Sequence, residues 1–200
     1  MSIKGKGFHL LLKHRHLMEG KLRAEVIDEH TSIEALREKT EASAAKLVKG
    51  IEGVTYIPAD FPDFYAEWIR VDGAPGDKVV LYFHGGGFVM GSARSHRSIV
   101  GNFASRLGVN ALSFDYRLAP EHPAPAAVFD GAKIYGWLQS QGYAPEDIVF
   151  AGDSAGAGIA LAAMLKIKDD GGILPVCCAV FSPCVDMTLS GDSIRTKAKA

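Results

Sequence analysis

Ser154 lies in a segment whose residue types predict a reactive serine, the ten residues VFAGDSAGAG. Gly152 and Gly156 flank it at a distance of two residues, so the segment fits the pattern G-x-S-x-G. Where a strand turns abruptly into a helix, the residue at the turn takes a strained backbone conformation, and glycines at these two positions avoid a clash with the neighbouring strand and helix. The serine hydroxyl would then project above the sheet, where it could act as a nucleophile. With 22 glycines in the chain, however, the same pattern could also be an ordinary serine that caps a helix.

A second glycine-rich motif, HGGG, begins at His84 and directly follows the apolar stretch KVVLYF. Three consecutive glycines allow backbone N–H groups to approach a ligand with no side chain in the way. We expect the amides of Gly85 and Gly86 to join the amide of Ala155, next to the serine, around a carbonyl oxygen that becomes negatively charged. A phosphate-binding loop is the less favoured alternative, because the pattern G-x-G-x-x-G and the lysine of a P-loop are both lacking here.

Two further side chains beside these motifs are expected to support the loops. His84 opens the glycine loop, and we expect it to orient that loop through a hydrogen bond and not to act as a catalytic base. Asp153 precedes the serine directly, and we expect it to hold the neighbouring backbone in place by hydrogen bonds. Neither residue is expected to bind a metal.

The composition favours one soluble globular domain and excludes some partners. The chain has 200 residues, of which 48% are hydrophobic, and a net charge of −1, so nothing overall attracts nucleic acid or an anionic membrane. No segment is apolar over enough residues to be a membrane span or a secretory leader. Three cysteines, an odd number, favour reduced thiols and a cytoplasmic location. A homodimer is left open.

Strand and helix patterns alternate through most of the chain. Residues 1–50 are expected to be helical and to form an N-terminal segment, and residues 51–200 are expected to form the core. In the core, we expect strands over 54–57, 67–71, 78–83, 109–115, 147–152 and 175–182, and helices over 95–107, 124–140 and 154–168. Strands that alternate with helices of this length indicate an α/β fold with a mostly parallel sheet.

The two glycine motifs, together with the stretch DYRLAPEHP between them, resemble the hormone-sensitive-lipase family of α/β-hydrolase esterases over about 51–193. The resemblance implies a serine carboxylesterase that acts on small esters with short to medium acyl groups, forms an acyl-enzyme on Ser154, and needs no metal or organic cofactor. It also implies that residues 1–50 form part of a cap over the substrate pocket. In DYRLAPEHP, Arg117 and Glu121 are expected to pair and to pin the loop beside the active site.

The remaining members of the catalytic triad are not evident in the sequence. All seven histidines precede Ser154, whereas the order in this fold is serine, acid, histidine. We therefore expect the acid and the histidine beyond residue 200, the last strands of the sheet to be missing from this chain, and the 200-residue chain to be inactive by itself. Two other readings stay open: a ligand-binding member of the fold without catalysis, similar to the plant gibberellin receptor, and a serine peptidase or amidase.

Overall fold

Six strands form one sheet in the part of the chain that the computed structural model describes, residues 31–47, 50–192 and 196. The strands are β1 (Val54–Pro58), β2 (Ala66–Val71), β3 (Val79–Phe83), β4 (Asn110–Phe114), β5 (Ile148–Asp153) and β6 (Cys177–Phe181). Their order across the sheet is β1-β2-β4-β3-β5-β6. β2 is antiparallel to both of its neighbours, and β4, β3, β5 and β6 are parallel to one another. The expected α/β class with a mostly parallel sheet is confirmed.

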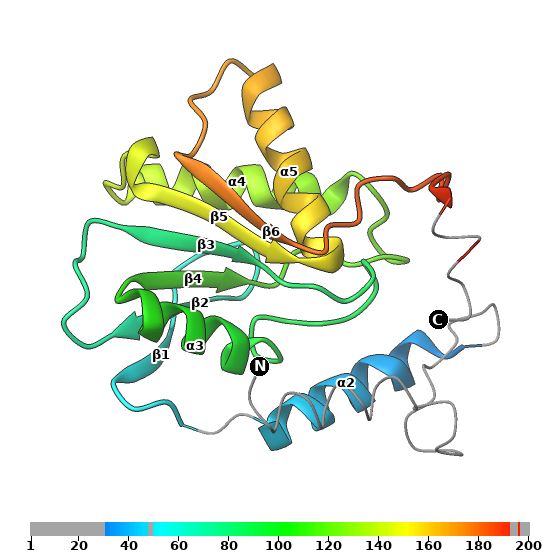
Figure 1. Ribbon diagram of the computed structural model, residues 1–200, viewed down its shortest axis with the longest axis horizontal. Coiled ribbons are helices and arrows are strands. Elements are labelled where there is room, and N and C mark those ends of the chain that lie inside the picture. The colour runs from blue at the N-terminus through cyan, green and yellow to red at the C-terminus, as the bar shows by residue number, and fades with distance from the viewer. Residues whose placement is uncertain (1–30, 48–49, 193–195, 197–200) are drawn as a thin grey trace. The chain divides into compact units, whose positions relative to one another are not determined.

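Helices cover both faces of this sheet (Figure 1). The helices that cover it are α3 (Arg97–Leu107), α4 (Ala126–Ser140) and α5 (Ser154–Asp169), and a short 3-10 turn (Pro145–Asp147) leads into β5. A further helix, α2 (Ile33–Leu47), precedes the first strand in the chain. α4 and α5 pack together on one face, and α3 packs on the other. Each crossover between parallel strands thus contains a helix, as the alternating sequence pattern predicted.

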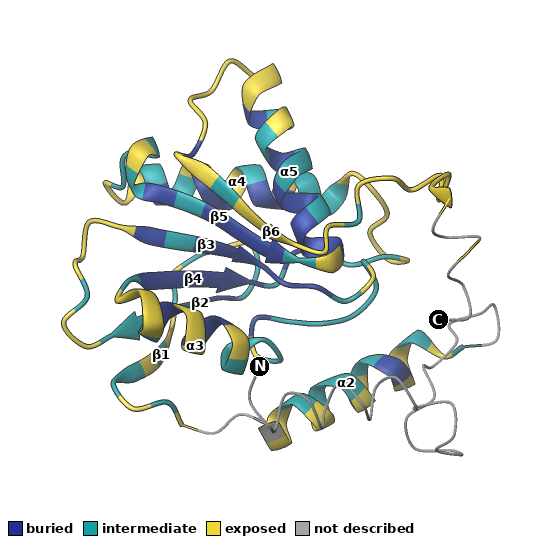
Figure 2. Cartoon of the chain, viewed as in Figure 1, coloured by how far each residue is buried: buried dark blue, intermediate teal, exposed yellow. Residues whose placement is uncertain are grey.

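Strand β3 shows how the sequence builds a core on both faces of the sheet. Val79, Leu81 and Phe83 pack into the apolar cluster that includes α4 and α5. Val80 and Tyr82 pack into the second cluster, beneath α3. Successive side chains of a strand point to opposite faces, so the unbroken apolar stretch KVVLYF fits a strand that is covered on both sides. In Figure 2 the central strands are accordingly the buried ones.

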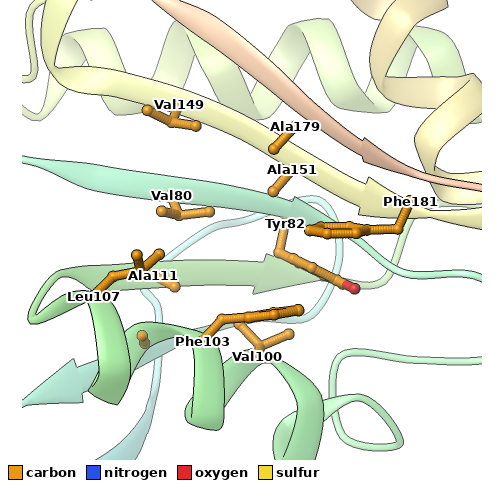
Figure 3. Close-up of a pocket in the computed structure, with 11 residues that line it drawn as sticks. Val80, Tyr82, Val100, Phe103, Leu107, Ala111, Val149, Ala151, Ala179 and Phe181 are labelled. Carbon is orange, nitrogen blue, oxygen red and sulfur yellow. The ribbon is translucent and has the colours of Figure 1, made fainter. Parts of the chain in front are cut away.

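The α3 face also contains an apolar cavity of about 90 Å³ (Figure 3). Side chains of α3, such as Phe103, line one wall, and side chains of β3 to β6 line the other. Phe181 of β6 stacks on Phe103 with ring centroids 5.3 Å apart, yet 45% of its surface stays exposed. The residues around this cavity include neither Ser154 nor the HGGG glycines, so it is separate from the candidate site.

The expected N-terminal segment can be followed only in part. Of residues 1–50, α2 is helical as expected, whereas 1–30 and 48–49 lie outside the described residues. α2 belongs to the same compact unit as the sheet, Ile33–Ala200. A boundary between a cap segment and a core at residue 50 stays a prediction. Among the described helices, none combines the length and apolarity that crossing a bilayer requires.

The expected pair between Arg117 and Glu121 is wrong. Arg117 instead binds Asp130 of α4, with its Nη2 2.7 Å from Oδ1, and its backbone N–H donates to the same carboxylate. Glu121 binds Arg37 of α2, with Oε2 2.8 Å from Nη2. A spacing of four residues brings two side chains together on a helix, but the segment around Glu121 forms turns, so the two side chains find separate partners.

Candidate active site

Ser154 lies where β5 ends and α5 begins, and its backbone has the strain that the motif predicts. Its φ is 51°, in the left-handed region that a residue with a side chain rarely adopts. The residue is exposed, and its Oγ has no hydrogen-bond partner among the described residues. The next residue, Ala155, is buried at the first turn of α5, where backbone N–H groups lack partners within the helix. The Ser154 hydroxyl and the Ala155 amide thus belong to adjacent residues at the start of α5.

The two flanking glycines are required because the elbow lies against the end of β3. A methyl group at Gly156 would lie 2.6 Å from the carbonyl carbon of His84, with the carbonyl oxygens of His84 and Phe83 closer still. A methyl group at Gly152 would lie 2.8 Å from the carbonyl oxygen of Phe83. Cβ atoms in proteins essentially never approach other atoms this closely, so a larger residue at either position would push β3 and α5 apart.

The HGGG loop makes a tight turn directly beyond β3. Gly86, Gly87 and Phe88 have φ values of 133°, 60° and 68°, three successive residues in the region that favours glycine. The carbonyl of Gly86 closes the turn by accepting hydrogen bonds from the amides of Val89 and Met90. Within the described residues, the amides of Gly86 and Gly87 donate to no acceptor, and Gly87 is exposed. These two amides are free to bind a ligand.

The structure corrects the role expected for the Gly85 amide. This N–H donates to Oδ1 of Asp153 at 2.9 Å. A methyl group at Gly85 would lie 2.9 Å from the Asp153 Cγ, so the carboxylate occupies the space that the absent side chain leaves. Because its only backbone proton is already bonded, Gly85 cannot serve as an oxyanion donor in this conformation. Its place in the motif is explained by its contact with Asp153.

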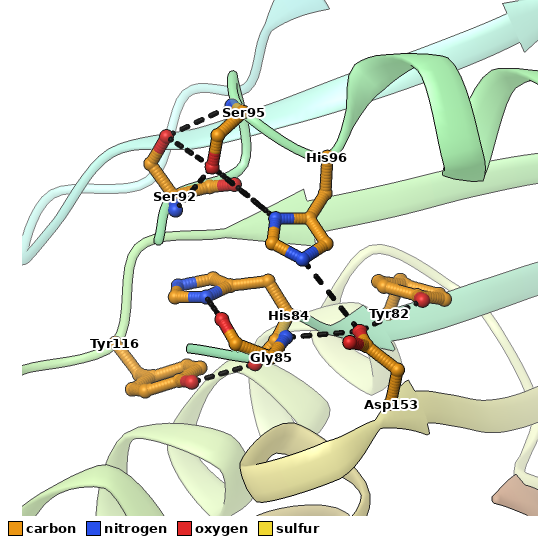
Figure 4. Close-up of polar contacts among 8 residues, drawn as sticks. All are labelled: Tyr82, His84, Gly85, Ser92, Ser95, His96, Tyr116 and Asp153. Atoms are coloured by element: carbon orange, nitrogen blue, oxygen red, sulfur yellow. Dashed lines mark hydrogen bonds and ion pairs between the residues drawn. The ribbon is translucent and has the colours of Figure 1, made fainter. Parts of the chain in front are cut away.

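Asp153 is the centre of a polar network that joins the turn at Ser154 to the HGGG loop (Figure 4). Its Oδ1 accepts the Gly85 amide and also the hydroxyl of Tyr82, at 3.0 Å. His96 Nε2 lies 3.7 Å from the same oxygen. Burial, followed by the charge of Asp153, raises the pKa of Tyr82, so its hydroxyl remains a donor. This arrangement supports the expected loop-supporting role of Asp153.

His84, the first residue of the HGGG loop, is fully buried. Its Nδ1 lies 2.9 Å from the carbonyl oxygen of Gly85, and its ring stacks on Tyr116 with centroids 4.2 Å apart. The Tyr116 hydroxyl donates to the carbonyl of His84 at 2.6 Å. Burial lowers the pKa of His84 to about 3, so the ring is neutral at ordinary pH. These contacts fit a residue that orients the loop and do not fit an exposed base.

Tyr82, Tyr116 and Arg37 contact the loops of this site and were not expected there from the sequence. Tyr82 carried a usable signal, because a tyrosine in an otherwise apolar buried strand needs a partner for its hydroxyl. Arg37 carried none, since its partners lie far away along the chain. In the described part of the chain, no group of three or more His, Cys, Asp or Glu side chains is arranged to hold a metal ion.

Comparisons with known proteins agree with this fold. Residues 80–200 match a family described as having the alpha/beta hydrolase fold. The chain is 36% identical over 140 residues to an esterase from Acinetobacter venetianus, and 40% identical over 132 residues to an acetyl-hydrolase from Streptomyces hygroscopicus. Each match covers 66% of this chain, but 46% and 44% of the relatives. The chain thus spans about half the length of these curated relatives.

Solved structures of esterases also superpose on this chain. EstE5, in a crystal soaked with p-nitrophenyl butyrate, superposes with a TM-score of 0.84 at 37% identity, over 95% of this chain and 63% of that one. An esterase from the bacterial hormone-sensitive lipase family gives a TM-score of 0.83 at 33% identity, over 99% and 64% of the two chains. The chain therefore belongs to the alpha/beta hydrolase family, and its expected resemblance to hormone-sensitive-lipase esterases is confirmed.

Proposed function

We propose that this chain carries the nucleophile and oxyanion hole of a serine carboxylesterase. The observation that carries the proposal is Ser154 itself, exposed at φ 51° on the first residue of a 16-residue helix. A strained turn of this kind persists only where the surrounding structure enforces it, and such strain concentrates at active sites. The helix N-terminus adds a partial positive charge beside the hydroxyl, which favours an oxyanion formed there.

The oxyanion would be held by three amides. We assign this role to Ala155, Gly86 and Gly87, since the Gly85 amide is bonded to Asp153. The Gly86 and Gly87 amides have no acceptor in the described ranges, and the strained turn holds them in a fixed orientation. Donors that are fixed before the reaction need no reorganisation when charge develops on the carbonyl oxygen.

The reaction would proceed through an acyl-enzyme. The Ser154 oxygen attacks the ester carbonyl carbon as its proton passes to a base, and the carbonyl π electrons move to the oxygen held by the amides. The tetrahedral intermediate collapses, the bond to the alcohol oxygen breaks, and the leaving alcohol takes the proton back from the base. A water molecule then repeats the sequence on the acyl-enzyme and releases the acid.

The base for this reaction is not among the hydrogen-bond partners of Ser154 in the described residues. His84 is buried and neutral, and His96 faces Asp153 and the backbone of Ser92. We propose that a histidine later in a longer protein, oriented by an acid, supplies the base. The greater length of the relatives is consistent with this assignment.

The substrate class we propose is small esters with short to medium acyl groups. The supporting comparisons are with a protein named acetyl-hydrolase and with a crystal soaked with p-nitrophenyl butyrate. We further propose that the protein acts in the cytoplasm, since its three cysteines are free thiols in the structure. Nucleic acid has no part in the proposed reaction.

Hydrolysis of p-nitrophenyl butyrate by the protein with its natural C-terminus tests the proposal. Ser154→Ala is expected to abolish turnover, whereas Ser140→Ala, which removes an exposed hydroxyl at the end of α4, is expected to leave it unchanged. Turnover that survives in Ser154→Ala contradicts the assignment. Tight binding of a small ligand without any turnover by the natural protein would favour the receptor reading, and cleavage of amides in preference to esters would favour the amidase.

A further inference from the structure

Arg37 of α2 holds together two loops that are far apart along the chain. Its Nε donates to the carbonyl of Val89 at 2.7 Å, in the segment that follows the HGGG glycines. Its Nη2 donates to the carbonyl of Ala119 at 2.9 Å, in the DYRLAPEHP loop. Its Nη1 and Nη2 also bind the two carboxylate oxygens of Glu121, at 2.9 and 2.8 Å. One side chain thus satisfies two backbone carbonyls and a carboxylate.

The Val89 carbonyl is part of the turn that presents the glycine amides. The amide of Val89 donates to the Gly86 carbonyl, which fixes the peptide unit before Val89 within the turn. The Val89 carbonyl accepts from Arg37, which fixes the peptide unit after it. The Phe88 carbonyl accepts the amide of Ala119, which ties the turn to the second loop. Arg37 therefore anchors the turn next to the three residues with positive φ.

The ion pair with Glu121 orients the Arg37 guanidinium. The hydrogen bonds from Arg37 lower the pKa of Glu121 to about 2, so the carboxylate is ionised at any pH used for an esterase assay. A guanidinium presents its donors as a planar fork, which matches a carboxylate and leaves Nε and Nη2 directed at the two carbonyls. A lysine ammonium, a compact charge, cannot reproduce this geometry.

Neighbouring residues of α2 contact the same segment. Thr40, one turn after Arg37, places its Oγ1 3.4 Å from the sulfur of Met90. Glu41 accepts a hydrogen bond from the Ser92 hydroxyl at 2.8 Å. Positions three and four apart lie on one face of a helix, so this face of α2 lies along the segment after the HGGG motif. Among these three residues, Arg37 makes the most hydrogen bonds across to the loops, two to backbone carbonyls and two to a carboxylate.

We propose that Arg37 is a positioning residue: from α2, it fixes the turn whose Gly86 and Gly87 amides hold the oxyanion. The inference rests on the proposed esterase function and adds that a side chain of α2 affects the rate of the reaction. Since the oxyanion exists only after the nucleophile attacks, loosening the turn weakens binding of the transition state more than binding of the ester. The expected signature is a lower kcat with little change in KM.

The experiment compares Arg37→Ala, Arg37→Lys and Lys78→Ala in the protein with its natural C-terminus, with p-nitrophenyl butyrate as substrate. Lys78→Ala is the control, because it removes an ion pair of 2.8 Å with Asp147 at the opposite end of β3. We expect Arg37→Ala to lower kcat by about 10- to 100-fold with KM changed by less than about 3-fold, from displaced donors. Arg37→Lys should also lose activity, and Lys78→Ala should match the natural protein.

Chemical rescue separates positioning from general destabilisation. Methylguanidinium at millimolar concentration should restore part of the kcat of Arg37→Ala, and methylammonium, with the same charge and no fork, should not. If Arg37→Ala does not fold, the kcat of Arg37→Lys gives the test. An unchanged kcat in a folded Arg37 variant, or a loss confined to KM, overturns the inference while the esterase function stands. A natural protein that hydrolyses no ester overturns both.

Discussion

Replacing Gly156 by alanine should damage the protein through one defined contact. The added methyl group would lie 2.6 Å from the carbonyl carbon of His84, about 0.8 Å inside the 3.4 Å at which ordinary van der Waals contact begins. The opposing atoms belong to the backbone at the end of β3, so no side chain can rotate away. The N-terminal turn of α5 must therefore move away from β3, and it carries both Ser154 and the Ala155 amide with it.

The size of the effect follows from this displacement. Overpacking of a rigid site costs about 1–3 kcal/mol, and the backbone-on-backbone contact places Gly156→Ala at the upper end. A shift of nearly 1 Å in the reacting groups lowers the rate by about 100-fold. Gly136→Ala is the matched control: this glycine lies in the exposed interior of α4 with open space around its missing side chain. There, alanine should stabilise the protein by about 0.5–1 kcal/mol through its higher helix propensity.

Urea denaturation of both variants, followed by circular dichroism, measures the stability difference, and p-nitrophenyl butyrate turnover measures the activity. We expect the two substitutions to change the free energy of unfolding in opposite directions, with activity lost only in Gly156→Ala. Equal stability and equal activity of the two variants would refute the argument that β3 and the elbow are in close backbone contact.

Three further predictions concern the polar network around Asp153, the half-buried Asp115 and the substrate. Asp153→Ala should lower the free energy of unfolding by about 1–3 kcal/mol, because the Gly85 amide and the Tyr82 hydroxyl lose their acceptor. Asp153→Asn keeps the Oδ1 acceptor, so it should lose less stability in the same urea titration. Burial raises the pKa of Asp115 from 3.8 to about 6, so folding disfavours its charged form. The natural protein should therefore lose about 2 kcal/mol of unfolding free energy relative to Asp115→Asn as the pH rises from 4 to 7. A difference that does not change with pH would contradict this. Initial rates should fall from p-nitrophenyl butyrate to the palmitate ester, and faster hydrolysis of emulsified long-chain triglyceride would exclude the proposed substrate class.

The order of the elements could be predicted from the sequence because each strand and helix has its own local signal. The unbroken apolar stretch of β3 indicates a strand buried on both faces, and G-x-S-x-G indicates the turn at Ser154. Boundaries were less accurate: the helix expected over 95–107 begins at Arg97, because Ser92 and Ser95 form a hydrogen-bonded turn before it. Local patterns fix the type of an element better than its ends.

The errors concern contacts between distant parts of the chain. The sequence places Gly85 in an oxyanion motif, but its amide partner, Asp153, is 68 residues away, and only the packing of β3 beside β5 brings the two together. Glu121 likewise finds Arg37, 84 residues earlier, instead of its near neighbour Arg117. From the sequence alone, a charged side chain such as Glu121 has several possible partners of opposite charge. The fold determines which partner lies within reach, and no local sequence pattern contains that distance.

Reaction of the natural protein with a fluorophosphonate, followed by proteolysis and mass spectrometry, tests directly whether Ser154 is the nucleophile. The reagent phosphonylates an activated serine and forms a stable mimic of the tetrahedral intermediate, so the labelled peptide identifies the nucleophile. We expect one labelled serine, Ser154, and loss of esterase activity in proportion to labelling. A label on any other serine, or full activity after Ser154 is labelled, would contradict it.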